Sequence, residues 1–257
     1  MIPYVTGHNL LADKVVVVTA AAGTGIGSAV AKRCLEEGAQ VLISDWHERR
    51  LGETLEQLAS EHGSNVTAVP CDVTDEAQVQ ELITGAVLRF GRLDVMINNA
   101  GLGGTKSLLD MTDDEWSRVL DVTLNGTFRC TRAALRQLVD QGGGGAVVNN
   151  ASVIGWRSQA GQAHYAAAKA GVMALTRCAA ADVAQHGIRV NAVAPSLAMH
   201  PFLAKVTSEE LLAELTEREA FGRAAEPWEV ANAMVFLASD YASYLTGEVL
   251  SVSSQHP

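Results

Sequence analysis

The chain has 257 residues, of which 48% are hydrophobic and 19% charged, and its formal net charge is −10. This length and composition suit one globular α/β domain with a large core. The acidic balance argues against nucleic acid or an anionic membrane as the main partner, because neither attracts a negatively charged surface. No uncharged apolar run reaches membrane-spanning length, and the first residues do not resemble a secretion signal, so a cytoplasmic location is expected.

Apolar runs alternate with helical patterns along the chain. Short runs rich in β-branched residues predict strands at 15–18, 41–44, 66–70, 94–97, 146–149 and 189–193. Helical patterns predict helices at 27–38, 48–62, 76–90, 112–140 and 163–185. The fourth of these helices opens with a capping box at 112–115. The alternation predicts right-handed βαβ units, and therefore a doubly wound α/β fold with helices on both faces of the sheet.

The segment 196–220 interrupts this alternation. Within it, Thr207-Ser208-Glu209-Glu210 has the form of another capping box and predicts a short helix. A long insertion after the carboxyl end of a strand is a candidate substrate lid, because ligands bind outside that edge of the sheet. An arm used for packing or for contact between subunits is the alternative.

A glycine-rich turn, TAAAGTGIG at residues 19–27, joins the first predicted strand to the first predicted helix. Glycines at such a turn let the backbone approach a pyrophosphate, and the helix start supplies N–H groups and the positive end of its dipole. The position between a strand and a helix makes this signal much stronger than the glycines alone. The residues expected to hold the phosphates are Gly23, Thr24, Gly25, Ile26 and Gly27.

Asp45 stands at the end of the second predicted strand, eighteen residues after Gly27. A carboxylate there can accept hydrogen bonds from the adenine ribose hydroxyls and repels a 2′-phosphate. NAD is therefore favoured over NADP as the cofactor. Arg49 and Arg50 follow closely and could instead meet a 2′-phosphate, which keeps NADP open.

Tyr165 and Lys169 lie four residues apart in a predicted helix, on one face of it, and Ser152 lies thirteen residues before Tyr165. An ammonium beside a phenol lowers the pKa of the phenol by favouring the phenolate. Moving that pKa from about 10 to about 7 takes roughly 4 kcal/mol of differential stabilisation. Such stabilisation is plausible in a partly dry cleft, so the three residues are a candidate catalytic set.

These features together resemble the short-chain dehydrogenase/reductase family over nearly the whole chain. Ser152 and the Tyr-x-x-x-Lys pair match the family's catalytic residues in type and spacing, and further family motifs occur in the right order. They are N-N-A-G at 98–101, Cys71-Asp72-Val73, RVNAVAP at 189–195, and a carboxyl-terminal signature made of Gly222-Arg223, Pro227, FLASD at 236–240 and YLTG at 244–247.

The resemblance implies a mechanism and a set of cofactor contacts. Tyr165 would act as general base or acid, Lys169 would lower its pKa and hold the nicotinamide ribose, and Ser152 would bind the substrate oxygen. The hydride would pass directly between substrate and nicotinamide. Further cofactor contacts implied by the family are Asp72, Val73, Asn99, Ala100, Gly101, Tyr165, Lys169, Pro195, Ser196 and Ala198.

The resemblance also implies an architecture and an assembly. The architecture is a single Rossmann-type domain over residues 1–257, with a seven-stranded, mostly parallel sheet. The assembly is a homotetramer or homodimer built through the two long helices at 112–140 and 163–185.

The sequence departs from the family pattern in several places. The glycine-rich turn has one extra residue, so either Gly23 or an alanine takes the place of the first glycine. Thr123, counted with the catalytic residues, stands where the family often has an asparagine that supports a water near the lysine. Ser196 replaces a glycine, and His200 stands where a threonine often contacts the carboxamide. The chain end, SVSSQHP, lacks the common D-G-G.

Other residues near these motifs allow a functional and a structural interpretation. Trp156 and Arg157 could bind an apolar or anionic substrate, or they could be a packed indole and a solvated guanidinium. His164 could be a second acid or base, but adjacent helix residues point apart, so a place beside the pocket or a role in capping the helix is favoured. Phe202 and Leu203 would make the lid apolar.

The cysteines and the possible metal ligands give no functional signal. The four cysteines form no C-x-x-C and are expected as buried thiols in a reducing cytoplasm. No metal site is expected, because no His/Cys/Asp cluster has ligand spacing.

The sequence thus predicts an NAD-dependent oxidoreductase that acts on a secondary alcohol or ketone of an apolar or acyl-thioester substrate. The glycine-rich turn and the segment 195–202 look like an actinobacterial branch linked to steroid-ring degradation, which points to a hydroxylated ring-fragment CoA thioester. Two alternatives remain: an NADPH-dependent 3-oxoacyl carrier-protein reductase, and a dinucleotide-binding sensor with little catalysis.

Overall fold

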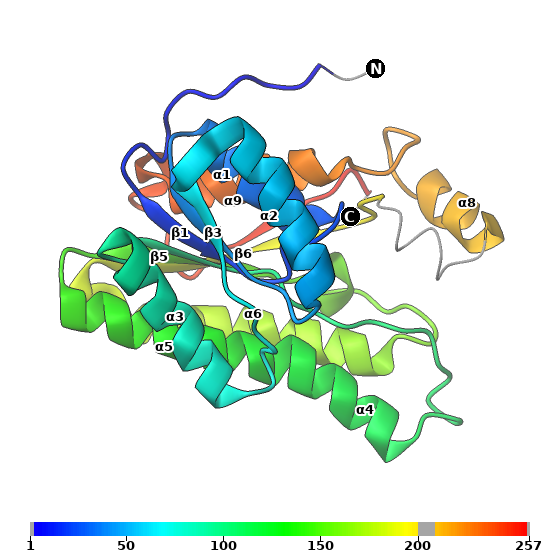
Figure 1. The fold of residues 1–257 in the computed structure, drawn as a ribbon. Helices are drawn as coiled ribbons and strands as arrows, with labels where there is room; N and C mark the ends of the chain where they lie inside the picture. The colour runs from blue at the N-terminus through cyan, green and yellow to red at the C-terminus, as the bar shows by residue number, and fades with distance from the viewer. Residues whose placement is uncertain (1–2, 200–208, 256–257) are drawn as a thin grey trace.

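The computed structural model describes residues 3–199 and 209–255, and its strands form one seven-stranded sheet (Figure 1). The strand order is β3-β2-β1-β4-β5-β6-β7, and all six neighbouring pairs are parallel. The order reverses between β1 and β4, and ligands of such sheets bind outside the carboxyl ends of the strands at this point. The strands are β1 Val15–Val18, β2 Gln40–Ile43, β3 Val66–Ala68, β4 Val95–Asn98, β5 Gly145–Asn150, β6 Ile188–Pro195 and β7 Val249–Val252.

Helices cover both faces of the sheet, as predicted. Figure 1 shows α1, α2 and α9 on one face and α3, α4, α5 and α6 on the other. The side chains of β1 alternate between the two layers: Val16 and Val18 pack in the core under α1 and α9, and Val15 and Val17 in the core over α3 and α5. The helices are α1 Ile26–Glu36, α2 Glu48–His62, α3 Glu76–Phe90, α4 Asp113–Leu120, α5 Gly126–Gln141, α6 Ala163–Val183, α8 Glu209–Glu217 and α9 Pro227–Ala238.

The capping box at Thr112 is present, and the helix predicted at 112–140 is continuous from Asp113 to Gln141, although it is not α-helical throughout. A π-helical turn, Asp121–Asn125, separates α4 from α5. The chain packs closely where α5 begins, because a Cβ built on Gly126 would lie 2.6 Å from Val73 Cγ2. The insertion of a π turn shifts the register of the helix there, and such turns are frequent at functional sites.

The carboxyl-terminal third differs most from the predicted pattern. β6 is longer than predicted and continues to Pro195, where Val252 of β7 lies beside it. The predicted capping box at 207–210 begins outside the described residues, and the short helix that it predicts is present as α8, described from Glu209. Cys34, Cys71 and Cys130 are buried as expected, whereas Cys178 is exposed, so that expectation was wrong for one thiol.

In the described part of the chain, no helix is long and apolar enough to cross a membrane.

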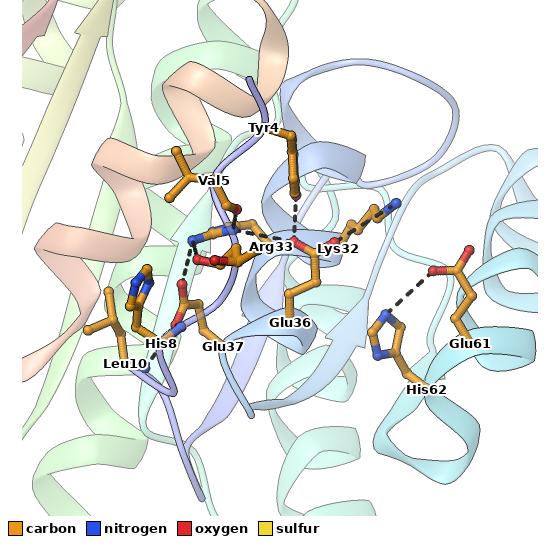
Figure 2. Close-up of polar contacts among 11 residues, drawn as sticks. Tyr4, Val5, His8, Leu10, Lys32, Arg33, Glu36, Glu37, Glu61 and His62 are labelled. Carbon is orange, nitrogen blue, oxygen red and sulfur yellow. Dashed lines mark hydrogen bonds and ion pairs between the residues drawn. The ribbon is translucent and has the colours of Figure 1, made fainter. Parts of the chain in front are cut away.

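An amino-terminal arm, residues 3–10, lies against α1 and is fixed by a buried ion pair (Figure 2). Arg33 and Glu37 are one helical turn apart, with Arg33 Nη2 2.6 Å from Glu37 Oε1, and both side chains are almost fully buried. The guanidinium also donates to the carbonyl of Val5, and the carboxylate accepts from the backbone N–H groups of His8 and Leu10 at 2.7 and 2.9 Å. The pair therefore connects two arm segments to one helix.

The end of the arm reaches α9. The Tyr4 ring packs edge to face on Trp228, with 5.3 Å between ring centroids, and its hydroxyl donates to Glu36. The backbone of the arm approaches α1 so closely that a Cβ on Gly7 would lie 2.2 Å from the carbonyl oxygen of Glu36. A glycine is needed at position 7 for this contact.

Candidate active site

Ser152, Tyr165 and Lys169 come together beyond the carboxyl end of β5. Ser152 lies two residues after this strand, and α6 carries Tyr165 and Lys169 one turn apart. Lys169 Nζ lies 5.4 Å from the centroid of the Tyr165 ring and donates to the carbonyl oxygen of Asn150 at 2.5 Å. The Ser152 side chain lies close enough to Tyr165 to lower the pKa of its hydroxyl through hydrogen bonding. A phenol, a hydroxyl and an amine thus share one site at the ligand-binding edge of the sheet.

Burial dominates the electrostatics of this set. It raises the pKa of Tyr165 to about 12, and the hydrogen bond from Ser152 acts in the opposite direction. Burial also lowers the pKa of Lys169 to about 8. The expectation that the pKa of Tyr165 falls to about 7 is therefore wrong in this structure. The dry surroundings remove water from the phenolate, and this raises the pKa of the phenol.

The Ser152 side chain is held by two backbone contacts. Its Oγ accepts from the backbone N–H of Ile154 at 3.3 Å and lies 3.5 Å from the carbonyl oxygen of Pro195, at the end of β6. The side chain is buried, with 8% of its surface exposed. Ser152 is therefore fixed by the turn that follows it and by the end of β6, beside the segment that the family resemblance places at the nicotinamide.

Hydrogen-bonded side-chain amides connect the ends of β4 and β5 to each other and to α6, next to the site. Asn98 Nδ2 donates to Asn149 Oδ1 at 2.8 Å, and Asn149 Nδ2 donates to the Thr176 hydroxyl of α6 at 2.9 Å. One residue further along each strand, Asn150 Nδ2 donates to Asn99 Oδ1 at 2.9 Å. These bonds align the ends of β4 and β5 with α6. The sequence reasoning missed Asn149 and Asn150, although two adjacent amides at the end of an apolar strand are an unusual pattern.

The glycine-rich turn leaves open space in front of the start of α1. A Cβ built on Gly23 or Gly25 would meet nothing within 4 Å, and Gly25, which precedes α1, has no side-chain cap. Gly27 packs closely instead, since its Cβ would lie 2.1 Å from the carbonyl oxygen of Ala20. The first N–H groups of α1 therefore face the open space that Gly23 and Gly25 leave.

The extra residue in this turn is accommodated by an alanine in a left-handed conformation. Ala20, directly after Thr19, has φ of 49°, and Gly23 has φ of 87°. Both candidates for the first glycine thus adopt positive φ, and the alanine takes the place immediately after the threonine. Thr19 lies below the turn, where its Oγ1 accepts from the backbone N–H groups of Asn99 and Ala100 at 3.0 and 3.1 Å.

Asp45 lies where the sequence places it, at the end of β2 and beside the turn. Its carboxylate accepts from the backbone N–H groups of Ala22 at 3.3 Å and His47 at 2.9 Å. Both nearby arginines face carboxylates: Arg49 pairs with Glu53 at 2.6 Å, and Arg50 lies 4.0 Å from Asp45. The negative charge of Asp45 is therefore fixed at the position expected for the adenine ribose.

Two neighbouring predicted contacts, Asp72 and Val73, have different surroundings. Asp72 is exposed, and its carboxylate accepts from the backbone and hydroxyl of Thr74 at 2.9 and 2.8 Å. The Val73 side chain is buried against Gly126, so only its backbone can meet a ligand. Asp72 alone of the two offers a side chain to an adenine.

Gly101 and Thr123 lie close to each other, and Gly101 lies beside Lys169. A Cβ on Gly101 would lie 3.5 Å from Lys169 Nζ and 3.8 Å from Thr123 Oγ1, so a glycine keeps the space beside the amine free. The Thr123 hydroxyl is bound to the backbone of Leu102, and its carbonyl accepts from the Thr127 hydroxyl at 2.8 Å. Thr123 therefore lies at the site but holds the loop after β4 rather than Lys169.

The remaining predicted residues follow β5 or β6, lie at the start of α6, or lie outside the described part of the chain. Ser196 donates its N–H to Val252 at 3.2 Å, and Ala198 pairs with Ala225. His164 is buried, and its Nδ1 accepts from the backbone N–H of Tyr165 at 2.9 Å, so it caps the start of α6. Trp156 is half exposed. Outside the described residues are His200, Phe202 and Leu203.

The open glycine turn, the uncapped start of α1, the carboxylate at the end of β2 and the space before Lys169 fit a dinucleotide lying across the switch point of the sheet. Within residues 3–199 and 209–255 no group of three or more His, Cys, Asp or Glu side chains could hold a metal ion. A dinucleotide would bring hydride chemistry to the edge where the phenol lies. Fold and site together define a dinucleotide-dependent oxidoreductase.

Comparison with known proteins agrees with this class. Residues 20–254 match the family model described as "Enoyl-(Acyl carrier protein) reductase". A Mycobacterium tuberculosis protein is 65% identical over 253 residues, covering 98% of this chain and 97% of its own, and is named "(5R,7aS)-5-hydroxy-7a-methyl-1-oxo-2,3,5,6,7,7a-hexahydro-1H-indene-carboxyl-CoA reductase". A Sinomonas cyclohexanicum protein named "Cis-4-hydroxycyclohexanecarboxylate dehydrogenase" is 43% identical over 242 residues, covering 94% of this chain and 95% of its own.

A solved structure is also similar over nearly the full length. The crystal structure of a short chain dehydrogenase from Mycobacterium smegmatis has a TM-score of 0.88 and 58% sequence identity, and the match covers 98% of this chain and 97% of that one. The chain therefore belongs to the short-chain dehydrogenase/reductase family, and it is an NAD(P)-dependent oxidoreductase.

Proposed function

We propose that the protein transfers a hydride between NAD and a secondary alcohol or ketone on an alicyclic ring that carries a carboxyl or acyl-thioester group. The observation that carries this proposal is the meeting of Ser152, Tyr165 and Lys169 beside the dinucleotide-binding turn. Here Tyr165 exchanges the proton of the substrate oxygen, Ser152 binds that oxygen, and Lys169 provides the positive charge.

The electrostatics support reduction as the direction that the site performs best at neutral pH. With the pKa of Tyr165 raised to about 12, the phenol is protonated and can give a proton to a developing alkoxide. Alcohol oxidation needs the phenolate, which burial disfavours until charges in the loaded site lower the pKa. We therefore expect ketone reduction to be efficient at neutral pH and alcohol oxidation to need higher pH.

The substrate class rests on the relatives. One is named for a reductase of a bicyclic carboxyl-CoA compound that bears both a hydroxyl and a ketone, and the other for a dehydrogenase of a hydroxycyclohexanecarboxylate. Both names contain an alicyclic ring, an oxygen substituent and a carboxyl-derived group. The same combination, in a steroid-derived ring fragment held as a CoA thioester, is the substrate that we propose for this chain.

NAD is proposed over NADP because of Asp45. A 2′-phosphate would bring about two negative charges close to this fixed carboxylate, and the nearest arginine, Arg50, already faces it. Two hydroxyls of an unmodified ribose can instead donate to the carboxylate. The ratio of kcat/KM for NADH and NADPH measures this preference directly.

The experiment that tests the function is a panel of cyclic ketones and alcohols, as free acids and as CoA thioesters, followed by the absorbance of reduced nicotinamide. Turnover of ring ketones with NADH supports the proposal. Preference for a straight-chain 3-oxoacyl carrier protein with NADPH would replace it with the carrier-protein reductase alternative. Cofactor binding without turnover of any compound would favour the sensor alternative.

We also propose self-association. β7 is the edge strand of a parallel sheet, and such strands are normally covered on both faces, yet Leu250 is 38% exposed. Phe128 of α5, a helix on one face of the sheet (Figure 1), is 42% exposed. A dimer or tetramer would cover both. Light scattering of the wild type and of Leu250→Glu and Phe128→Glu variants tests this, with a monomeric wild type as the contradicting result.

A further inference from the structure

A buried carboxylate, Glu219, joins three segments beside the candidate active site. Glu219 lies two residues after α8, and only 4% of its surface is exposed. Oε1 accepts from the backbone N–H of Leu197, just after β6, at 3.2 Å. Oε2 accepts from the backbone N–H of Ser254 at 3.3 Å and from its hydroxyl at 2.8 Å. A carboxylate in this position aligns the end of β6 with the carboxyl-terminal tail.

The contacts continue through Gln255 to Arg157. Gln255 Nε2 donates to Glu219 Oε1 at 3.1 Å, and the two residues also form an antiparallel bridge. The carbonyl oxygen of the same amide accepts a hydrogen bond from Arg157 Nη1. The amide thus lies between a buried negative charge and an exposed positive charge, and its orientation is fixed because Glu219 can only accept and Arg157 can only donate.

Arg157 is close to the candidate catalytic residues along the chain. The short 3-10 turn Val153–Gly155 follows Ser152, and the backbone N–H of Arg157 donates to the carbonyl of Val153 at 3.0 Å. One nitrogen of the guanidinium is bound to Gln255, and the side chain is exposed, so the rest of its N–H fork is open to a ligand. Such a fork matches the two oxygens of a carboxylate, and one of its N–H groups can donate to the single carbonyl oxygen of a thioester.

We infer that Glu219, through Gln255, positions Arg157 to bind the carboxyl-derived end of the substrate while Tyr165 and Ser152 act on its ring oxygen. This inference rests on the proposed function, whose substrate carries both groups. It also explains the unusual chain end. Ser254 and Gln255 both bind Glu219, which the common D-G-G ending could not do through its glycine side chains. Arg157 is the specificity-determining residue and Glu219 a positioning residue.

The test compares two probes that share a ring and a hydroxyl: cis-4-hydroxycyclohexanecarboxylate and cyclohexanol, each oxidised with NAD at alkaline pH. We expect Arg157→Ala to raise KM for the carboxylate by at least about tenfold, the effect of losing a charged hydrogen bond, and to leave KM for cyclohexanol and kcat for both probes within about twofold. Glu219→Gln should give the same split, because its amide NH₂ would face hydrogen-bond donors. The double variant should be no worse than Arg157→Ala alone.

Matched variants keep the test decisive. Glu217→Gln removes the same charge from an exposed side chain two residues away and should change nothing. Gln255→Ala cuts the connection near the chain end and should show the same split even where Glu219→Gln fails to fold. An equal rise of KM on both probes, no rise on either, or additive effects in the double variant would overturn the inference.

Failure of the proposed function would give a different result. In that case neither probe is turned over by the wild type. Equilibrium binding of the two probes to the NAD-saturated protein then replaces KM in the same comparison of variants. Loss of carboxylate binding alone in Arg157→Ala, Glu219→Gln and Gln255→Ala supports the positioning of Arg157, and unchanged or equally weakened binding refutes it.

Discussion

The hydroxyl of Thr123 binds the backbone of Leu102 in both directions. It accepts from the N–H of Leu102 at 2.9 Å and donates to its carbonyl oxygen at 3.0 Å. Thr123 is fully buried in the π-helical turn between α4 and α5, and Leu102 follows the glycine that faces Lys169. One side chain thereby fixes the loop after β4 to the helix beside the active site.

Replacing this hydroxyl should loosen the site. Thr123→Val keeps the shape but leaves the N–H and carbonyl of Leu102 without their partner, so we expect a loss of about 1–3 kcal/mol in the free energy of unfolding and a lower kcat. Thr123→Ser keeps the hydroxyl and should stay close to the wild type. Urea unfolding and steady-state kinetics measure both effects, and a fully active, stable Thr123→Val would contradict this role.

Removing the Tyr165 hydroxyl should remove the chemistry and spare the cofactor. Tyr165→Phe keeps the aromatic ring, so the fold and the NAD site should persist, whereas loss of proton transfer should lower kcat by at least about a hundredfold. Cofactor titration by intrinsic fluorescence should give a dissociation constant within about twofold of the wild type. Undiminished turnover in this variant would rule out Tyr165 as the proton-transferring group.

The buried Lys169 should make stability depend on pH. Its pKa is about 8 in the folded protein and about 10.4 in an unfolded chain, so between these values the unfolded chain holds a proton that the folded protein lacks. Stability therefore rises as pH increases through this window, by up to about 3 kcal/mol in total. Below pH 8 both states are protonated and the penalty for burying the charge is fully present.

Lys169→Met tests this sign. Urea unfolding at intervals from pH 7 to pH 10 should show the wild type gaining stability relative to the variant as pH rises. The comparison stops at pH 10 because the raised pKa of Tyr165 has the opposite effect above it, where the unfolded chain loses the phenol proton first. Parallel curves for the two proteins over the whole range would show that burial of Lys169 is not coupled to pH.

Cofactor choice should follow the charge of Asp45. Asp45→Ser removes the repulsion of a 2′-phosphate and keeps a hydrogen-bonding group, so the NADPH to NADH ratio of kcat/KM should rise by at least about tenfold. Glu48→Gln, an exposed change of equal charge in the first turn of α2, serves as the control and should leave the ratio near the wild-type value. A wild type that already prefers NADPH would contradict the proposed cofactor.

The ion pair beneath the amino-terminal arm should matter for stability more than for activity. Arg33→Met leaves the carboxylate of Glu37 buried without a positive partner, and we expect a loss of about 3–5 kcal/mol in the free energy of unfolding. The double change to Met at both positions removes the uncompensated charge and should recover most of this loss. Urea unfolding separates the cases, and equal stability of the single and double variants would contradict the argument.

Local patterns in the sequence were sufficient for most of the fold. The run Val15–Val18 predicted a strand buried on both faces, and the structure divides its side chains between the two core layers. The bounds of α2 and α3 and the capping box at Thr112 were also predicted correctly. In each case the signal comes from neighbouring residues, which share one element and one environment.

The parts that the sequence could not reveal depend on residues far apart in the chain. The π turn lies where Gly126 meets Val73, and the raised pKa of Tyr165 results from the burial of its whole surroundings. Glu219 is an ordinary acidic residue in the sequence, and its role depends on Leu197 and Ser254. Periodicity cannot show such contacts, because it describes each element separately.

The left-handed conformation of Ala20 fixes the shape of the glycine-rich turn before any nucleotide binds. An alanine with φ of 49° costs about 1–2 kcal/mol relative to a relaxed backbone. The missing side chain of Gly27 lets the start of α1 press on the Ala20 carbonyl, and Asn99 Nδ2 donates to that carbonyl at 3.1 Å. The free-energy cost of this turn conformation is thus part of the free energy of folding. If a pyrophosphate binds at this turn, it would meet a backbone that already has this shape.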